Sequence, residues 1–307
     1  MKAFDEINHN YQNRYSEAGK WKESGGKVVG YISAAIPEEI IMAAGLFPLR
    51  LAGDIERETD LADQYMEFSF DPLVRSLYDM LLAGEFDFLD LLVIPHVNDS
   101  VFRLYYYLME NKRQGTHPNL PDLYLLDILY TKWWGIGQYN LERIKDFKKK
   151  IEMISERPIN IDDLKEAISA ANENRKLLQE VNQKRRHDPP LLCGADAIQI
   201  YSTSMKKADH SRILKDLLED ESIFTSKAPT RLMFSGNPLD HTHLYQLIED
   251  LNLTIVLEDH DWGSGYAEHL VDEQADPLDA ITERYHFHTI TPKVYPEAAD
   301  QSEVLKK

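Results

Sequence analysis

Short apolar runs alternate with helical segments along the chain, and this alternation decides the class of fold. Residues 27–32 and 88–94 form two such runs, and each is followed by residues that favour the start of a helix. Further apolar runs lie at 123–126, 231–234 and 253–257. Strands that are separated by helices predict an α/β fold with parallel sheets and right-handed crossover connections.

The apolar spacing also divides the chain into three parts. From residue 141 to about 187 the spacing is helical and charged residues dominate, and Pro189-Pro190 then precede a second alternation of helices and strands. We therefore predict an N-terminal helix plus a first α/β domain over 1–140, a helical bridge over 141–188 and a second α/β domain over 189–307. Both domains would place their loops after the carboxyl ends of parallel strands, where open α/β sheets bind ligands.

The charge balance narrows the choice of partners. The chain has 34 lysines and arginines against 52 aspartates and glutamates, a formal charge of −18 at pH 7. Nucleic acids and anionic membranes are bound mainly by basic patches, whereas the basic runs at 148–150 and 184–186 are short. No stretch approaches the roughly 18 apolar residues of a membrane helix, and the N-terminal residues are too polar for a signal peptide. We expect a cytoplasmic protein that binds neither nucleic acid nor a membrane.

Cys193 is the single cysteine of the sequence. One thiol excludes an intrachain disulfide, and it also excludes a zinc or iron–sulfur site that this chain builds from several cysteines. We interpret Cys193 as a small buried apolar side chain.

Three segments that follow predicted strands carry a resemblance to a known family. They are residues 30–39, continuing through 43–50, then 93–100 and 256–263, with support from 231–240 and 280–285. Together they resemble the corresponding blocks of the 2-hydroxyacyl-CoA dehydratase and benzoyl-CoA reductase family, from about residue 27 to 292. The resemblance implies two flavodoxin-like (Rossmann-like) domains joined by a helical segment, and a related subunit as partner. It also implies a [4Fe-4S] cluster between the domains, held by three cysteines, one from each block, and reduced by an ATP-dependent activator.

The sequence departs from this family at the three cysteine positions. By alignment they are occupied by Ser33, Asn98 and Trp262. A [4Fe-4S] cluster is ordinarily held by thiolates, and a hydroxyl, an amide and an indole are poor substitutes. We therefore expect no cofactor in this chain and a [4Fe-4S] cluster in the partner subunit. Trp262 is far bulkier than a thiol, so either the pocket is closed or it holds a different ligand against an aromatic wall.

A few other residues are candidates for chemistry. His96 follows a strand and could serve as a general acid or as a donor to a thioester carbonyl, while His260 and Asp261 lie in the third block, where clustered carboxylates can perturb a pKa. The remaining histidines show no standard metal spacing, so we predict no metal site. Glu38 and Glu39 are interpreted as stabilising the positive end of a helix.

The resemblance and the missing thiols lead to one functional hypothesis and its alternatives. The chain is expected to be a cluster-less subunit that pairs, as a heterodimer, with a cysteine-bearing homologue in an acyl-CoA lyase or reductase complex of anaerobic metabolism. This chain would shape the acyl-CoA pocket while the partner performs the redox chemistry. The alternatives are a stand-alone non-redox enzyme that acts on acyl thioesters or with a metal in the interdomain cleft, and a non-catalytic ligand-binding or scaffold protein.

Overall fold

The first half of the molecule is built on a parallel four-stranded sheet. The computed structural model describes residues 2–131 and 133–289. The strands are β1 (Val28–Tyr31), β2 (Phe47–Arg50), β3 (Leu91–Pro95) and β4 (Asp122–Leu126), arranged in the order β2-β1-β3-β4. Every neighbouring pair is parallel. The structure confirms the predicted α/β fold, and this strand order is consistent with a flavodoxin-like domain.

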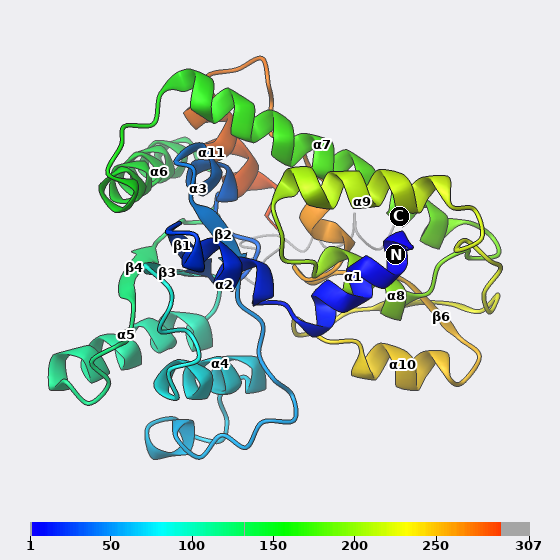
Figure 1. Ribbon diagram of the computed structural model, residues 1–307, viewed down its shortest axis with the longest axis horizontal. Coiled ribbons are helices and arrows are strands. Elements are labelled where there is room, and N and C mark those ends of the chain that lie inside the picture. The colour runs from blue at the N-terminus through cyan, green and yellow to red at the C-terminus, as the bar shows by residue number, and fades with distance from the viewer. Residues whose placement is uncertain (1, 132, 290–307) are drawn as a thin grey trace.

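Helices cover both faces of this sheet (Figure 1). The helices α4 (Pro72–Leu82) and α5 (Asp99–Gln114) lie on one face, and α3 (Glu38–Ala43), α6 (Trp134–Ser155) and α11 (Pro277–Phe287) lie on the other. Alternate residues of β3 pack on opposite faces of the sheet. Leu92 and Ile94 pack in the core beneath α4 and α5, and Leu91 and Val93 pack in the core beneath α3, α6 and α11. A strand that is buried on both faces reads as a continuous apolar run, which explains why β3 is recognisable in the sequence.

The second half has a smaller sheet. Strands β5 (Arg231–Phe234) and β6 (Thr254–Glu258) form a parallel pair. Within the described residues this sheet has these two strands. Around them lie α7 (Ile161–Arg186), α8 (Gly194–Tyr201), α9 (Lys207–Glu219) and α10 (His243–Glu249), with the 3₁₀ turn η2 (Ser264–Ala267) after β6. Helices α6 and α7 occupy most of residues 141–188, while the division into domains stays a prediction.

Two elements of the first half differ from the sequence-based expectation. A single N-terminal helix was expected, but the chain forms α1 (Ala3–Gln12) and α2 (Ser16–Glu23). The break arises because α1 packs against α8 and α9 of the second half, whereas α2 packs against β1 and β2. The sequence did not predict strand β2, because this strand is short and contains Pro48. Proline is tolerated here because β2 lies at the edge of the sheet.

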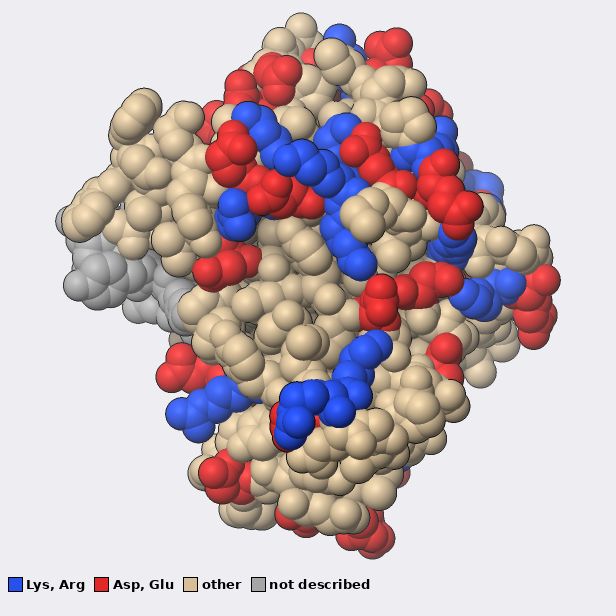
Figure 2. Space-filling model, turned by 90° about the vertical axis from the view of Figure 1, so that its left-hand side faces the viewer, with Lys and Arg blue, Asp and Glu red and all other residues tan. Residues whose placement is uncertain are grey.

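Charged side chains of both signs share the surface. Figure 2 shows one face, on which lysines and arginines lie among aspartates and glutamates. On α6 the basic run is paired throughout: Lys148 with Glu152, Lys149 with Asp146 and Lys150 with Asp122. Among the described residues no helix is both long enough and apolar enough to cross a membrane.

Candidate functional site

Ser33 and Asn98, two of the three positions that are predicted to replace cluster thiols, follow neighbouring strands. The strand order β2-β1-β3-β4 places a topological switch point between β1 and β3, because the chain adds β2 on one side of β1 and β3 on the other. Open α/β sheets bind ligands outside the carboxyl ends of the two strands at a switch point. Ser33 follows β1, and Asn98 follows β3. The Ile32 amide donates to the Val93 carbonyl at 3.3 Å, so the pairing of the two strands continues up to Ser33.

The third block reaches the first block from the other half of the molecule. Asp261, after β6, accepts a hydrogen bond from the Ala34 amide at 3.0 Å through Oδ2. The same carboxylate forms an ion pair with Arg50 at 3.0 Å, and Arg50 also donates to the Asp261 carbonyl at 2.9 Å. These contacts bring the loop of Ser33 and the loop of Trp262 together.

Trp262 is buried in this interface between the two halves. Its side chain is 3% exposed, and the Arg50 guanidinium lies 3.7 Å from the indole centroid, a cation–π contact. Trp262 lines a cavity of about 40 Å³ together with Tyr31, Lys207 and Tyr266. A space of that size has room for a few water molecules. Ser33 and Asn98 are not among the residues that line it.

Ser33 and Asn98 both serve the local backbone. Ser33 has a φ of 67°, in the left-handed region, and its Oγ accepts from the Ala35 amide at 3.3 Å. Asn98 is the N-cap of α5, and its Oδ1 accepts from the Val101 amide at 2.8 Å. The Ser33 hydroxyl and the Asn98 amide oxygen therefore stabilise the turns that follow β1 and β3.

The donor set at the three positions does not fit a thiolate-bound cluster. A hydroxyl, a capping amide and an indole stacked under a guanidinium supply no sulfur ligand. Cys193 lies at the N-cap of α8, outside all three blocks. Burial, with Asp196 and Glu249 adding to it, raises the pKa of its thiol, so that Cys193 stays protonated.

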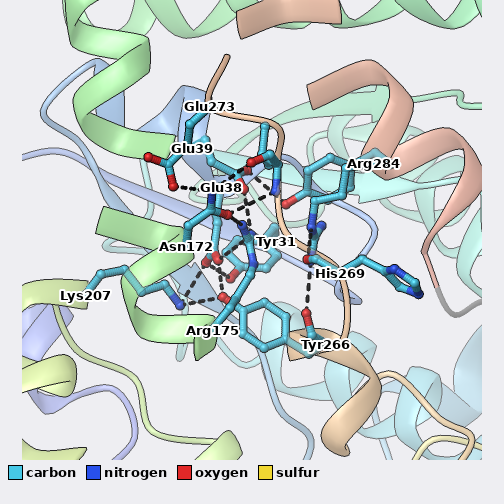
Figure 3. A network of polar contacts seen from close by, with 12 residues as sticks. Tyr31, Glu38, Glu39, Asn172, Arg175, Lys207, Tyr266, His269, Glu273 and Arg284 are labelled. Carbon is cyan, nitrogen blue, oxygen red and sulfur yellow. Dashed lines mark hydrogen bonds and ion pairs between the residues drawn. The ribbon is translucent and has the colours of Figure 1, made fainter. Parts of the chain in front are cut away.

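Figure 3 shows a network of buried polar side chains, among them Glu38, Lys207 and Tyr266. These three residues also line the Trp262 cavity. Arg175 of α7 is completely buried and contacts Glu39 at 2.6 Å and Glu38 at 3.4 Å. Lys207 of α9 lies 3.1 Å from Glu38. Three tyrosine hydroxyls donate to these carboxylates, namely Tyr31 and Tyr266 to Glu38, and Tyr285 to Glu39. The network thus joins α3 to α7, α9, η2 and α11.

Glu38 and Glu39 lie in the first turn of α3, as the sequence predicted, but they also form buried ion pairs that the sequence did not suggest. Pro37 is the N-cap of α3, and no side chain within the described residues caps this helix. Burial opposes ionisation of Glu38, but Lys207 and Arg175 outweigh it and lower the pKa of the carboxyl group to about 2. The two carboxylates are paired charges at the centre of the molecule.

The two candidate histidines have different partners in the structure. His260 is 2% exposed, its Nε2 is 2.9 Å from the Tyr245 hydroxyl, and burial lowers its pKa, which keeps the ring neutral. His96 is partly exposed at the end of β3, and its Nδ1 is 2.7 Å from Asp127 Oδ1. Sequence reasoning did not select Asp127, although it is the first residue after β4 and so lies at the same sheet edge.

Comparison with known proteins assigns the chain to a family. The family model described as 2-hydroxyglutaryl-CoA dehydratase, D-component, matches residues 33–307. The chain therefore belongs to this family, which confirms the resemblance seen in the sequence.

Individual relatives are similar over much of the chain. It is 28% identical to a benzoyl-CoA reductase subunit of Thauera aromatica over 66% of this chain and 53% of that protein. It is 22% identical to the (R)-phenyllactyl-CoA dehydratase beta subunit of Clostridium sporogenes, over 86% of this chain and 70% of the relative. A third relative is the beta subunit of the (R)-2-hydroxyglutaryl-CoA dehydratase of Acidaminococcus fermentans, 21% identical over 78% and 63% of the two chains. The chain thus spans about half to 70% of the length of these relatives.

Proposed function

We propose that this chain is a non-redox subunit of a 2-hydroxyacyl-CoA dehydratase-type or benzoyl-CoA reductase-type complex. It holds no iron–sulfur cluster, and it pairs with a homologue that carries one. The observation that supports this proposal is that a member of this family has a single cysteine, Cys193, which cannot supply three thiolates. The positions that we align with the cluster thiols hold Ser33, Asn98 and Trp262.

The geometry around Trp262 supports a structural use of this position, which we align with a cluster thiol. Asp261 and Arg50 connect the third block to the first, and the guanidinium of Arg50 covers the indole. The adjoining cavity of about 40 Å³ has room for a few water molecules. In the proposed complex this chain stabilises the assembly and shapes the wall of the acyl-CoA pocket, while electron transfer takes place in the partner.

The names of the relatives support a partner subunit. One relative is described as a subunit of a reductase, and two others as beta subunits of dehydratases. A chain whose relatives act as subunits, and which itself has no thiol at the three positions, is expected to depend on a second chain for redox chemistry.

Co-expression tests the pairing. The chain is expressed anaerobically with family members that keep a cysteine at each of the positions of Ser33, Asn98 and Trp262, and the mixtures are analysed by size-exclusion chromatography and iron analysis. We expect a one-to-one complex whose iron is retained when Cys193 is replaced by serine, because the iron belongs to the partner. A chain that elutes as a monomer beside every cysteine-bearing family member contradicts the proposal.

A further inference from the structure

The Trp262 cavity has a wall that is partly polar and partly apolar. Leu178, Met205 and Trp262 supply apolar surface, and Asn174 and Ser202 are among the polar residues of the wall. A buried water molecule needs several polar partners, and the apolar part of the wall does not supply them. The cavity therefore suits a small molecule with one apolar end and one polar end better than it suits water alone.

Asn174 of α7 has a side-chain oxygen without a partner. The residue is completely buried, and its Nδ2 donates to Nδ1 of His210 and to Oγ of Ser211, each at 3.2 Å. These two contacts use both hydrogens of the amide nitrogen and fix the orientation of the amide. Oδ1 is left without a hydrogen bond to any residue that the structure describes. A ligand that donates a hydrogen bond would satisfy this oxygen.

Ser202, the residue after α8, supplies a second polar group of the same kind. It is 2% exposed, and its Oγ forms no hydrogen bond within residues 2–131 and 133–289. A hydroxyl can both donate and accept a hydrogen bond. Because a buried polar group without a partner is unfavourable, a ligand that bonds to both Asn174 and Ser202 is stabilised by two such groups.

The charged side chains of the wall already have partners of opposite charge. They are Glu38, Arg50 and Lys207. Lys207 lies 3.1 Å from Glu38, as Figure 3 shows, and Arg50 lies 3.0 Å from Asp261. A charged ligand would add a buried charge without a counter-charge, which is unfavourable. The wall therefore favours an uncharged ligand.

We propose that the Trp262 cavity binds an uncharged organic compound with a methyl group at one end and a group that donates and accepts hydrogen bonds at the other, as in a short primary amide. The cavity of about 40 Å³ corresponds to about three water molecules, or to about four non-hydrogen atoms of such a compound. The ligand donates to Asn174 Oδ1 and accepts from the Ser202 hydroxyl, and its methyl group packs against Leu178 and Met205. This inference goes beyond the proposed function because it requires neither a partner chain nor a cluster.

Three probes of the same shape test the chemistry of the ligand on the isolated full-length chain. Acetamide has the donor, the acceptor and no charge, whereas acetone lacks the donor and acetate carries a charge. Binding is measured by saturation-transfer NMR titration. We expect saturable binding of acetamide with a Kd of about 1 mM, an affinity within the limit for so small a ligand. Acetone and acetate are each expected to bind at least about tenfold more weakly.

A pair of serine variants tests the location of the site. Ser202→Ala is expected to weaken the binding of acetamide by about fivefold, because it removes one of the two polar contacts. Ser264→Ala is the matched control. Ser264 is also 2% exposed and its Oγ also lacks a partner within the described part of the chain, but it does not line the cavity. This variant is expected to keep the wild-type affinity.

The comparison of probes uses the wild-type chain, so it decides the question even where a variant fails to fold. Absence of saturable acetamide binding would show that the cavity holds water only, and it overturns the inference. Acetone or acetate that binds less than tenfold more weakly than acetamide also overturns it. So does wild-type affinity in folded Ser202→Ala, or an equal loss in Ser264→Ala. None of these outcomes bears on whether the chain pairs with a cluster-bearing homologue.

Discussion

Replacing Arg175 by methionine is expected to lower the free energy of unfolding by about 3–5 kcal/mol. Arg175 is fully buried and lies 2.6 Å from Glu39, which is also fully buried. Without the guanidinium, Glu39 retains the Tyr285 hydroxyl at 2.9 Å but no ion pair with another residue that the structure describes. A buried unpaired carboxylate is strongly unfavourable. Urea denaturation at pH 7 followed by circular dichroism measures the change.

Two further variants separate this effect from a general loss of an arginine. Arg212 is 55% exposed and pairs with Glu6 at the surface, so Arg212→Met is expected to cost less than about 1 kcal/mol. Adding Glu39→Gln to Arg175→Met removes the unpaired charge and is expected to recover part of the lost stability. Equal effects of Arg175→Met and Arg212→Met would show that the buried network does not stabilise the fold.

Acidification from pH 6.5 to pH 5 is expected to destabilise the protein, with His210 as one identifiable cause. His210 of α9 is 3% exposed, and burial, helped by the nearby Lys207, lowers its pKa to about 3. Between about pH 6.5 and pH 3 the unfolded chain binds a proton at this histidine and the native chain does not. Stability therefore falls as pH falls, by about 2 kcal/mol from pH 6.5 to pH 5 for this one residue.

Comparing variants over that pH interval isolates the contribution of His210. Between pH 6.5 and pH 5 the free energy of unfolding of His210→Gln is expected to fall by about 2 kcal/mol less than that of the wild type, because glutamine does not titrate. His260 and His241, whose pKa values burial also lowers, contribute equally in both proteins. Glu38 titrates between about pH 4.5 and 2, so it stays outside the interval. The exposed His9→Gln serves as control, and a pH dependence of His210→Gln that matches the wild type would contradict the assignment.

The strands of the fold could be predicted from sequence wherever both faces are buried. The segments around β1 and β3 are continuous apolar runs because each packs against two helical layers. The edge strand β2 was missed because half of its side chains are only partly buried and because it contains a proline. The break between α1 and α2 was missed because it depends on α1 contacting the second half, which no local pattern records.

The candidate site could be predicted only in part. The sequence placed Ser33 and Asn98 at the ends of strands, but it did not show that Arg50 covers Trp262 or that Asp261 binds the Ala34 amide. Glu39 and its partner Arg175 are 136 residues apart, and two adjacent glutamates before an apolar helix look the same whether they stabilise its end or form buried ion pairs. Partners at such separations are set by the tertiary fold.

The central proposal is that this member of the family stores no electrons of its own. The most direct measurement is the content of iron and acid-labile sulfide in the purified full-length chain after anaerobic reconstitution, with a cysteine-bearing relative treated in parallel and Cys193→Ser as a control for adventitious binding. We expect the relative to take up a cluster while this chain and its Cys193→Ser variant hold only substoichiometric iron. Stoichiometric iron and sulfide in this chain, retained in the variant that has no thiol, would contradict the proposal.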